Sequence, residues 1–320
     1  MRNLKVLLAL VVVAAFFGML YWTGELSSLA RVADVQPLAV VGVTAVTLGL
    51  ILVSTWRLKL VTERVSAVGR LPFVGLYRVV LAGVTLGQVV PQDIASAGAR
   101  IAYLKGSRGM TMRDSAFAVF LDRWTDLVML LAAMPGAVLL VFGLVTPNQG
   151  IVLLIVVSLL FSIVGAVRPG IVNGLYMLTF GLLSAVMHRL RPRTAVSDPT
   201  PIAVSGWAFL LVLVSGAVRL AIVGLRAWVV VFALGIDLSL AQVLLIAPIA
   251  QVALMVPITP GGLGVYDAGW YGLLVVLGVS PSEALLFIVL HRVLNLLALL
   301  ILVALTETPV QIGKLARSMR

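Results

Sequence analysis

Long apolar runs separated by short polar loops fill most of this chain. A helix needs about 20 apolar residues to cross the hydrocarbon core of a bilayer, and six runs approach or exceed that length. They cover residues 4–22, 37–56, 115–142, 151–167, 207–234 and 281–305. The pattern predicts an all-α polytopic membrane protein with about six full spans. No small-residue cleavage site follows the first run, so we expect an uncleaved span there and not a secretory signal.

Two further apolar regions, 72–104 and 240–278, are interrupted by proline and glycine. Pro91 stands in the middle of the first region, and Pro257 and Pro260 stand in the second. Proline removes a backbone donor and glycine weakens a helix, so both regions should break. Broken backbone at membrane depth is tolerated where it is buried in protein or lines a cavity. We therefore predict two re-entrant helical hairpins.

An offset of 169 residues aligns the two halves of the chain without a gap. Arg57, Pro91, Asp122, Arg123 and Asp126 align with Arg226, Pro260, His291, Arg292 and Asn295. In the predicted topology the two hairpins open to opposite sides, so the copies form an inverted internal repeat, which is characteristic of transporters. Chance similarity between apolar sequences is the alternative. The repeat divides one transmembrane domain, 1–320, into a first copy at 37–167 and a second copy at 207–305.

Basic residues are concentrated in a few connecting segments, and this bias predicts the orientation. They gather in loops 57–70 and 105–113, in segment 168–206 and in tail 306–320, whereas the turn TPNQG at 146–150 carries no charge. Lys and Arg mark cytoplasmic loops, so we expect both termini in the cytoplasm and the protein in the cell membrane. Residues 1–36 then supply the first span and an external loop, and 168–206 form a cytoplasmic or interfacial linker.

Composition excludes several functional classes. Hydrophobic residues make up 62% of the chain and charged residues 11%, which is too apolar for a soluble core. The 23 Lys and Arg outnumber the 12 Asp and Glu, but they are spread over loops and helix interiors, which argues against nucleic-acid binding. The absence of cysteine excludes disulfides and thiolate metal sites. With only two histidines we expect no metal and no other cofactor.

Charged and polar side chains inside the spans are the candidate site, because a charge in hydrocarbon costs about 2.5–3.5 kcal/mol on insertion scales. They are Asp122, Arg123 and Asp126 in the fourth apolar region, Arg219 and Arg226 two turns apart, and His291, Arg292 and Asn295 in the last span. Residues three or four apart share a helix face. We interpret these groups as a charged pathway for an anionic head group whose acyl tails stay in the lipid.

A simpler interpretation is that these charges form ion pairs that lock the helices together. Arg123 would pair with Asp126, and Arg292 with a distant carboxylate such as Asp93 or Asp267. The two interpretations can coexist. His291 is interpreted as a hydrogen-bonded packing residue, with a proton relay as the alternative.

The broken regions add polar groups of their own. Gln88, Gln92 and Asp93 surround the first break, and Gly261 and Gly262 lie in the stretch PITPGGLGVYD at the second. Successive backbone amides near glycines can cradle a lipid phosphate, although a purely structural break is equally consistent. The stretch lacks the Lys-Ser or Lys-Thr ending of a nucleotide loop. We therefore expect passive or ion-coupled transport.

Several of these motifs together resemble the flippase-like transmembrane domain of lysylphosphatidylglycerol synthases. They are Trp56-Arg57, GVTLGQVVPQD at 83–93, LDRWTD at 121–126, PITPGGLGVYDAG at 257–269 and the pair His291-Arg292. The resemblance spans about 35–305 and implies movement of a lipid between leaflets, by a stand-alone member of that family. It also implies Glu where this chain has Asp267, whose shorter side chain has a different reach. We expect no lysyl transfer, because the resemblance includes no soluble aminoacyl-transfer domain.

Three functions are consistent with the sequence. The first is a lipid flippase or scramblase for a phospholipid or lipid-linked sugar, which is not an enzyme. The second is a lipid-modifying membrane enzyme that uses Asp93, Asp122 or Asp126 as base or metal ligand. The third is a non-catalytic partner of a glycosyltransferase or another membrane protein, and a homo-oligomer is left open. For the first, the expected substrate-binding residues are Arg57, Gln88, Gln92, Asp93, Asp122, Arg123, Asp126, Arg219, Arg226, Gly261, Gly262, Asp267, His291, Arg292 and Asn295.

Overall fold

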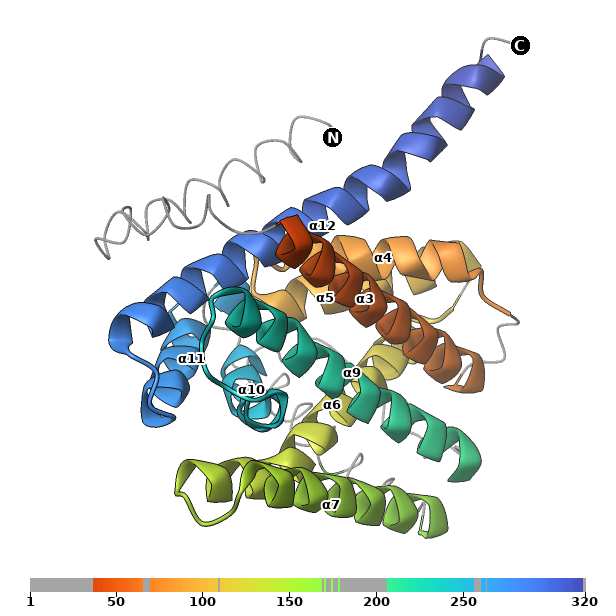
Figure 1. Ribbon diagram of the computed structural model, residues 1–320. Coiled ribbons are helices and arrows are strands. Elements are labelled where there is room, and N and C mark those ends of the chain that lie inside the picture. Colours follow the sequence, from red (N-terminus) through yellow and green to blue (C-terminus); the bar gives the residue numbers. More distant parts are fainter. Residues whose placement is uncertain are drawn as a thin grey trace, which may run out of the picture.

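The computed structural model describes residues 37–65, 70–108, 110–168, 206–255, 260–262 and 264–318, with three isolated positions between 170 and 178. Within these residues every regular element is helical. Five helices are long and apolar enough to cross a membrane: α3 (Pro37–Val65), α6 (Met112–Val141), α7 (Pro147–Val167), α9 (Gly206–Ala233) and α12 (Pro281–Ser318). They confirm the all-α polytopic class (Figure 1). The first predicted span, 4–22, and most of segment 168–206 lie outside the described residues.

The start of α7 corrects one local prediction. The turn expected at 146–150 is instead the cap and first turn of α7. Thr146 accepts a bond from the Gln149 amide at 3.4 Å, and the Gln149 side chain accepts one from the Thr146 amide at 2.8 Å. Pro147 fits the first helical position because its missing N–H needs no partner there. The last helix also differs from the predicted span, since α12 continues past 305 to Ser318.

Each predicted hairpin is a pair of shorter helices with a break between them. The first pair is α4 (Phe73–Leu86) and α5 (Gln92–Arg108), and the second is α10 (Leu240–Met255) and α11 (Val265–Val276), preceded by the 3₁₀ helix η2 (Pro260–Gly262). Gly83 is one of the glycines of the first interrupted region, 72–104. It lies within α4, where an added Cβ would approach the Ser96 Cα of α5 to 3.0 Å. It therefore serves close packing and not a break. That the pairs enter and leave the membrane on one side stays a prediction.

The offset of 169 residues relates whole helices. It carries the first residue of α3 onto that of α9, the last of α4 onto that of α10, and the first of α6 onto that of α12. The equivalent helices α3 and α9 pack side by side and antiparallel (Figure 1). Gly42 near the start of α3 lies against Val229, whereas Arg57 near its end lies against Gly216. The two copies are therefore inverted with respect to each other.

Two apolar clusters form the core. One is built mainly from α3 to α6 and includes the buried Leu76 and Met129. The other is built mainly from α9 to α12 and includes the buried Trp270 and Phe287. Each cluster is thus centred on one copy but also takes residues from the other, such as Val43 in the second cluster and Leu213 in the first. The charged residues described below likewise come from helices of both copies.

Close contact between α6 and α7 depends on glycine. A Cβ added at Gly136 would lie 2.7 Å from the Gly150 carbonyl oxygen, which is backbone and cannot rotate away. Gly136→Ala should therefore destabilise the protein by about 1–3 kcal/mol, measured as a lower Tm in detergent. Gly49→Ala is the matched control, because nothing lies within 4 Å of the added atom. Equal Tm values for the two variants would contradict this packing.

Candidate functional site

The two hairpin breaks lie against each other. Gly261 in η2 has φ 56°, a left-handed conformation that glycine adopts readily. A Cβ added there would lie 3.3 Å from the Gln88 carbonyl oxygen. Helix α5 also contacts both η2 and α10. The break of one copy therefore meets the break of the other, as in transporters built from inverted repeats.

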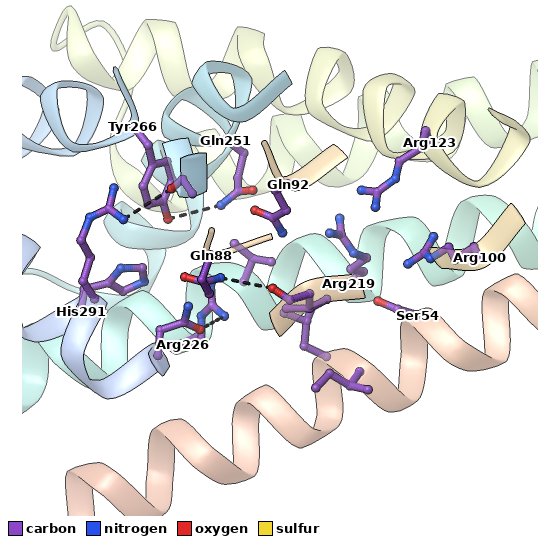
Figure 2. A pocket seen from close by; sticks show the side chains of 17 residues that line it. Ser54, Gln88, Gln92, Arg100, Arg123, Arg219, Arg226, Gln251, Tyr266 and His291 are labelled. Carbon is purple, nitrogen blue, oxygen red and sulfur yellow. Dashed lines mark hydrogen bonds between the residues drawn. The ribbon is translucent and has the colours of Figure 1, made fainter. Parts of the chain in front are cut away.

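A cavity opens at this junction, and arginines from both copies line it. They are Arg100 on α5, Arg123 on α6, Arg219 and Arg226 on α9, and Arg292 on α12. Figure 2 shows Arg100, Arg123 and Arg219 at one end, and Arg226, Tyr266 and His291 at the other. Gln88, Gln92 and Gln251 lie between the two ends. Charged and neutral hydrogen-bonding groups thus cover most of the cavity wall.

Behind the first end lies a buried ion network centred on Arg57. Its Nε lies 2.7 Å from Asp122 Oδ1, and its Nη1 lies 2.6 Å from Asp126 Oδ1. Arg100 pairs with the other oxygen of Asp122. The Arg57 side chain is 1% exposed and that of Asp122 is 0% exposed. Because one arginine meets two carboxylates here, the charge of Arg57 is fully compensated inside the protein.

Arg123 and Arg219 connect this network to the cavity. Arg219 Nη1 lies 3.1 Å from Asp126 Oδ2, and Arg123 Nη1 lies 3.8 Å from the same oxygen. Arg123 also donates to the Ser96 hydroxyl at 2.5 Å and pairs with Asp93 at 3.2 Å. Both arginines are therefore held by side chains of the first hairpin or of α6 while they still line the cavity.

The second copy repeats one of these contacts with different chemistry. Arg226, the equivalent of Arg57, donates from Nη1 to the Asn295 side-chain oxygen at 2.7 Å. This bond spans 69 residues, as does the bond from Arg57 to Asp126. The position equivalent to Asp122 is His291. Two carboxylates in the first copy are thus replaced by an amide and an imidazole in the second.

Arg292 is held by Asp267 through a two-pronged ion pair. Its Nε and Nη2 lie 2.7 and 2.8 Å from the two carboxylate oxygens. Asp267 also accepts a bond from the Gly264 amide at 2.9 Å, and Arg292 lies 3.4 Å from the Gly261 carbonyl oxygen. The shorter carboxylate at 267 therefore still reaches both the arginine and the glycine loop. The Gly264 amide is occupied by Asp267 and is not free to cradle a phosphate.

Ion pairing and cavity lining coexist in this arrangement. The expected pair of Arg123 with Asp126 is present, and Arg292 pairs with Asp267, whereas Asp93 pairs with Arg123. In the part of the chain that the structure describes, some arginine N–H groups nevertheless have no acceptor. Among the described residues, the buried Nε atoms of Arg100, Arg123 and Arg226 have no hydrogen-bond partner. Buried donors of this kind need an acceptor, so the cavity is suited to an anion or to water.

A second, mostly apolar hollow adjoins the cavity. It lies between α5, α6 and α9, and we call it the α5–α6–α9 groove. Ala97, Ile101 and Phe120 are among its apolar lining, and Arg123 and Arg219 line both the groove and the cavity. An apolar chain in the groove would therefore have its polar end next to the arginines.

The equivalent space in the second copy is filled by aromatic rings. Tyr266 and Trp270 stand where the first copy has Ala97 and Ile101. Their rings meet edge to face with centroids 6.3 Å apart, and Trp270 packs on Phe287 at 5.1 Å. All three side chains are buried. We call Tyr266, Trp270 and Phe287 the aromatic plug.

The predicted site residues fall into three groups. Those that line the cavity are Gln88, Gln92, Arg123, Arg219, Arg226, Gly261, His291, Arg292 and Asn295. Asp93 and Asp126 line the adjoining groove. The remaining four, Arg57, Asp122, Gly262 and Asp267, are outside both linings, where three of them hold arginines or lie in the ion network.

Sequence reasoning missed four polar cavity residues. Ser54, Arg100, Gln251 and Tyr266 line it but were not among the predicted site residues. A signal existed for Gln251, which is one of two glutamines in the otherwise apolar helix α10, and for Arg100, which lies in the first broken region. Tyr266 carried no such signal, because an aromatic residue beside a glycine loop is more often packing.

Comparison with known proteins adds the family. No curated protein matches the chain. A family model described as the lysylphosphatidylglycerol synthase TM region matches residues 5–302, which is nearly the whole chain. The match includes both hairpins, the cavity and the ion network, and it agrees with the resemblance seen in the motifs. This multi-pass membrane protein therefore belongs to the lysylphosphatidylglycerol synthase TM region family.

Proposed function

We propose that this protein moves a lipid with an anionic head group between the two leaflets of the cell membrane. The observation that carries the proposal is the cavity at the junction of the two inverted copies, lined by five arginines, three of which keep a buried Nε without a partner among the described residues. Guanidinium groups are the side chains best suited to phosphate oxygens. The family supports a role in lipid chemistry or transport.

The arrangement of cavity and groove supports a lipid as the cargo. A head group in the cavity would contact arginines, while one acyl chain would follow the apolar α5–α6–α9 groove. Arg123 and Arg219 stand where the two spaces join, so the head group of such a lipid would begin beside them and extend into the cavity. The inverted copies supply the two halves that transporters use to open to each face in turn.

Transport accounts for the carboxylates better than catalysis does. Asp122 and Asp126 are each held by arginines at short distance, and Asp93 is paired with Arg123. A general base must accept a proton from its substrate, and a neighbouring arginine makes a carboxylate a weaker proton acceptor. We therefore propose a transporter that is not an enzyme. From the basic loops and the broken helices we also propose that both termini lie in the cytoplasm and that the two helix pairs are re-entrant hairpins.

Reconstitution into vesicles tests the proposal. Purified protein in liposomes with a fluorescent phosphatidylglycerol or phosphatidic acid should raise the fraction of probe that dithionite or a lipid-binding protein reaches from one side, above empty liposomes. Heat-denatured protein is the control for damage to the bilayer. Equal rates with and without protein for every anionic lipid would overturn the proposal. Activity only after a co-purified partner is added would instead favour the non-catalytic partner function.

A further inference from the structure

The two copies of the repeat differ at their buried α3 and α9 arginines. Arg57 faces two carboxylates at 2.7 and 2.6 Å, whereas its equivalent Arg226 faces one amide oxygen at 2.7 Å and has His291 at the position of the second carboxylate. Arg226 is only 9% exposed, and its Nε has no hydrogen-bond partner among the described residues. A buried guanidinium without a counter-ion is strongly unfavourable. Arg226 therefore lacks the anion that Arg57 finds inside the protein.

The charges around the cavity as a whole also show a shortage of negative charge. Six arginines, the five of the lining and Arg57 behind it, face four carboxylates. The carboxylates are Asp93, Asp122, Asp126 and Asp267, and each is already paired with at least one arginine. With His291 counted as neutral, a formal excess of two positive charges remains among the described residues. The buried Oδ2 of Asp126 has no hydrogen-bond partner among the described residues, but it lies 3.1 Å from Arg219 Nη1, so the ammonium group of an aminoacylated lipid would have to compete with that arginine.

We propose that the cavity selects a lipid whose phosphate carries two negative charges, a phosphomonoester or diphosphate, with Arg226 as its main anchor, and that it rejects a cationic aminoacylated head group. The phosphate oxygens take the place that the two missing carboxylates would fill. This inference rests on the proposed function, since it names the substrate class of the same site. The inferred substrate therefore differs from lysylphosphatidylglycerol, the lipid that appears in the name of the family.

The position of the α5–α6–α9 groove gives the lipid a direction. The groove joins the cavity beside Arg123 and Arg219, and the aromatic plug fills the equivalent space near Arg226. The acyl chains therefore leave at the first-copy end, while the terminal phosphate extends towards Arg226. A diphosphate or an extended phosphomonoester head group matches this span of arginines better than a neutral or cationic one.

A series of short-chain lipids tests the charge selection on the unaltered protein. Binding of dioctanoyl phosphatidic acid, dioctanoyl phosphatidylglycerol, lysyl-phosphatidylglycerol and inorganic phosphate is measured by tryptophan fluorescence or thermophoresis in neutral detergent. A phosphomonoester carries about −1.5 to −2 near neutral pH, so phosphatidic acid should bind at least tenfold more tightly than phosphatidylglycerol. The lysyl lipid should show no saturable binding, and free phosphate should bind more weakly than the lipid. Lysyl lipid binding as tightly as phosphatidic acid overturns the inference.

Asn295→Asp tests the anchor. It would give Arg226 the carboxylate that Arg57 has in Asp126, and it should weaken phosphatidic acid binding at least tenfold without lowering Tm. Asn148→Asp makes the same chemical change at an exposed position on α7 and should bind like the unaltered protein. Unchanged affinity in Asn295→Asp contradicts the role of Arg226, and if that variant does not fold, His291→Asp supplies the same carboxylate from the neighbouring position.

The inference and the proposed function fail in different ways. Vesicles in which phosphatidylglycerol and the lysyl lipid move equally fast would leave transport standing and reject the charge selection. Tight binding of phosphatidic acid without accelerated movement of any lipid would keep the selection and reject transport.

Discussion

Replacement of Arg57 by glutamine is expected to lower the free energy of unfolding by about 3–5 kcal/mol, because it breaks a buried ion pair and leaves charge without compensation. Arg57 Nε and Nη1 lie within 2.7 Å of Asp122 and Asp126, and the side chain is 1% exposed. Glutamine can donate hydrogen bonds but carries no charge, so it cannot compensate either carboxylate. The low dielectric of a membrane protein interior makes the remaining repulsion between the carboxylates stronger.

The measurement is unfolding of the purified protein in detergent, followed by circular dichroism with heating or added denaturant. Arg78→Gln is the matched control, since Arg78 is 34% exposed and lies 4.0 Å from Glu307. A partly exposed pair of this kind contributes at most about 1 kcal/mol. A loss in Arg57→Gln no larger than in the control would mean that the network does not stabilise the bundle.

Arg226→Gln is expected to have the opposite effect: the protein stays nearly as stable, and lipid movement becomes much slower. Arg226 donates to the Asn295 side-chain oxygen and also interacts with the Tyr266 hydroxyl, and glutamine can keep a bond to either of these neutral groups. No carboxylate loses its partner, so the change in stability should stay within about 1 kcal/mol. A charge-assisted bond to the cargo contributes about 1.5–3 kcal/mol, so lipid movement should slow by about 10- to 100-fold.

Lipid movement in vesicles and Tm in detergent are measured on the same preparation. Arg78→Gln serves again, because it removes one arginine from a helix without touching the cavity. It should move lipid like the unaltered protein. Transport by Arg226→Gln at the unaltered rate would show that the arginine is structural, like its equivalent Arg57.

The sequence was sufficient for most of the architecture. Apolar runs predicted the five described spans, and Pro91 and Pro260 marked both breaks. The offset of 169 residues holds for the boundaries of several helices, because the equivalent elements follow one another in the same order in both copies. The turn at 146–150 was wrong because proline at a helix start looks like a turn residue when its capping partner Gln149 is overlooked.

The site was harder to predict than the fold. The repeat placed Arg57 and Arg226 at equivalent positions, but their partners lie 65 and 69 residues away and depend on how α3 and α9 pack against α6 and α12. Arg57 was therefore expected in the binding site, and it lies behind the cavity lining. The packing of consecutive helices, α5 on α6 and α11 on α12, also decided that Asp93 holds Arg123 and that Asp267 holds Arg292.

The aromatic plug bears on how the proposed transporter would divide its time between the states open to each side of the membrane. Two large rings bury about 150–250 Å² each, so withdrawing Tyr266 and Trp270 into water would cost several kcal/mol. Ala97 and Ile101 are too small to restore that contact by closing in the first copy. For the proposed transport, we therefore expect the two outward- and inward-open states to differ in energy, with the aromatic plug favouring the state in which its rings stay buried.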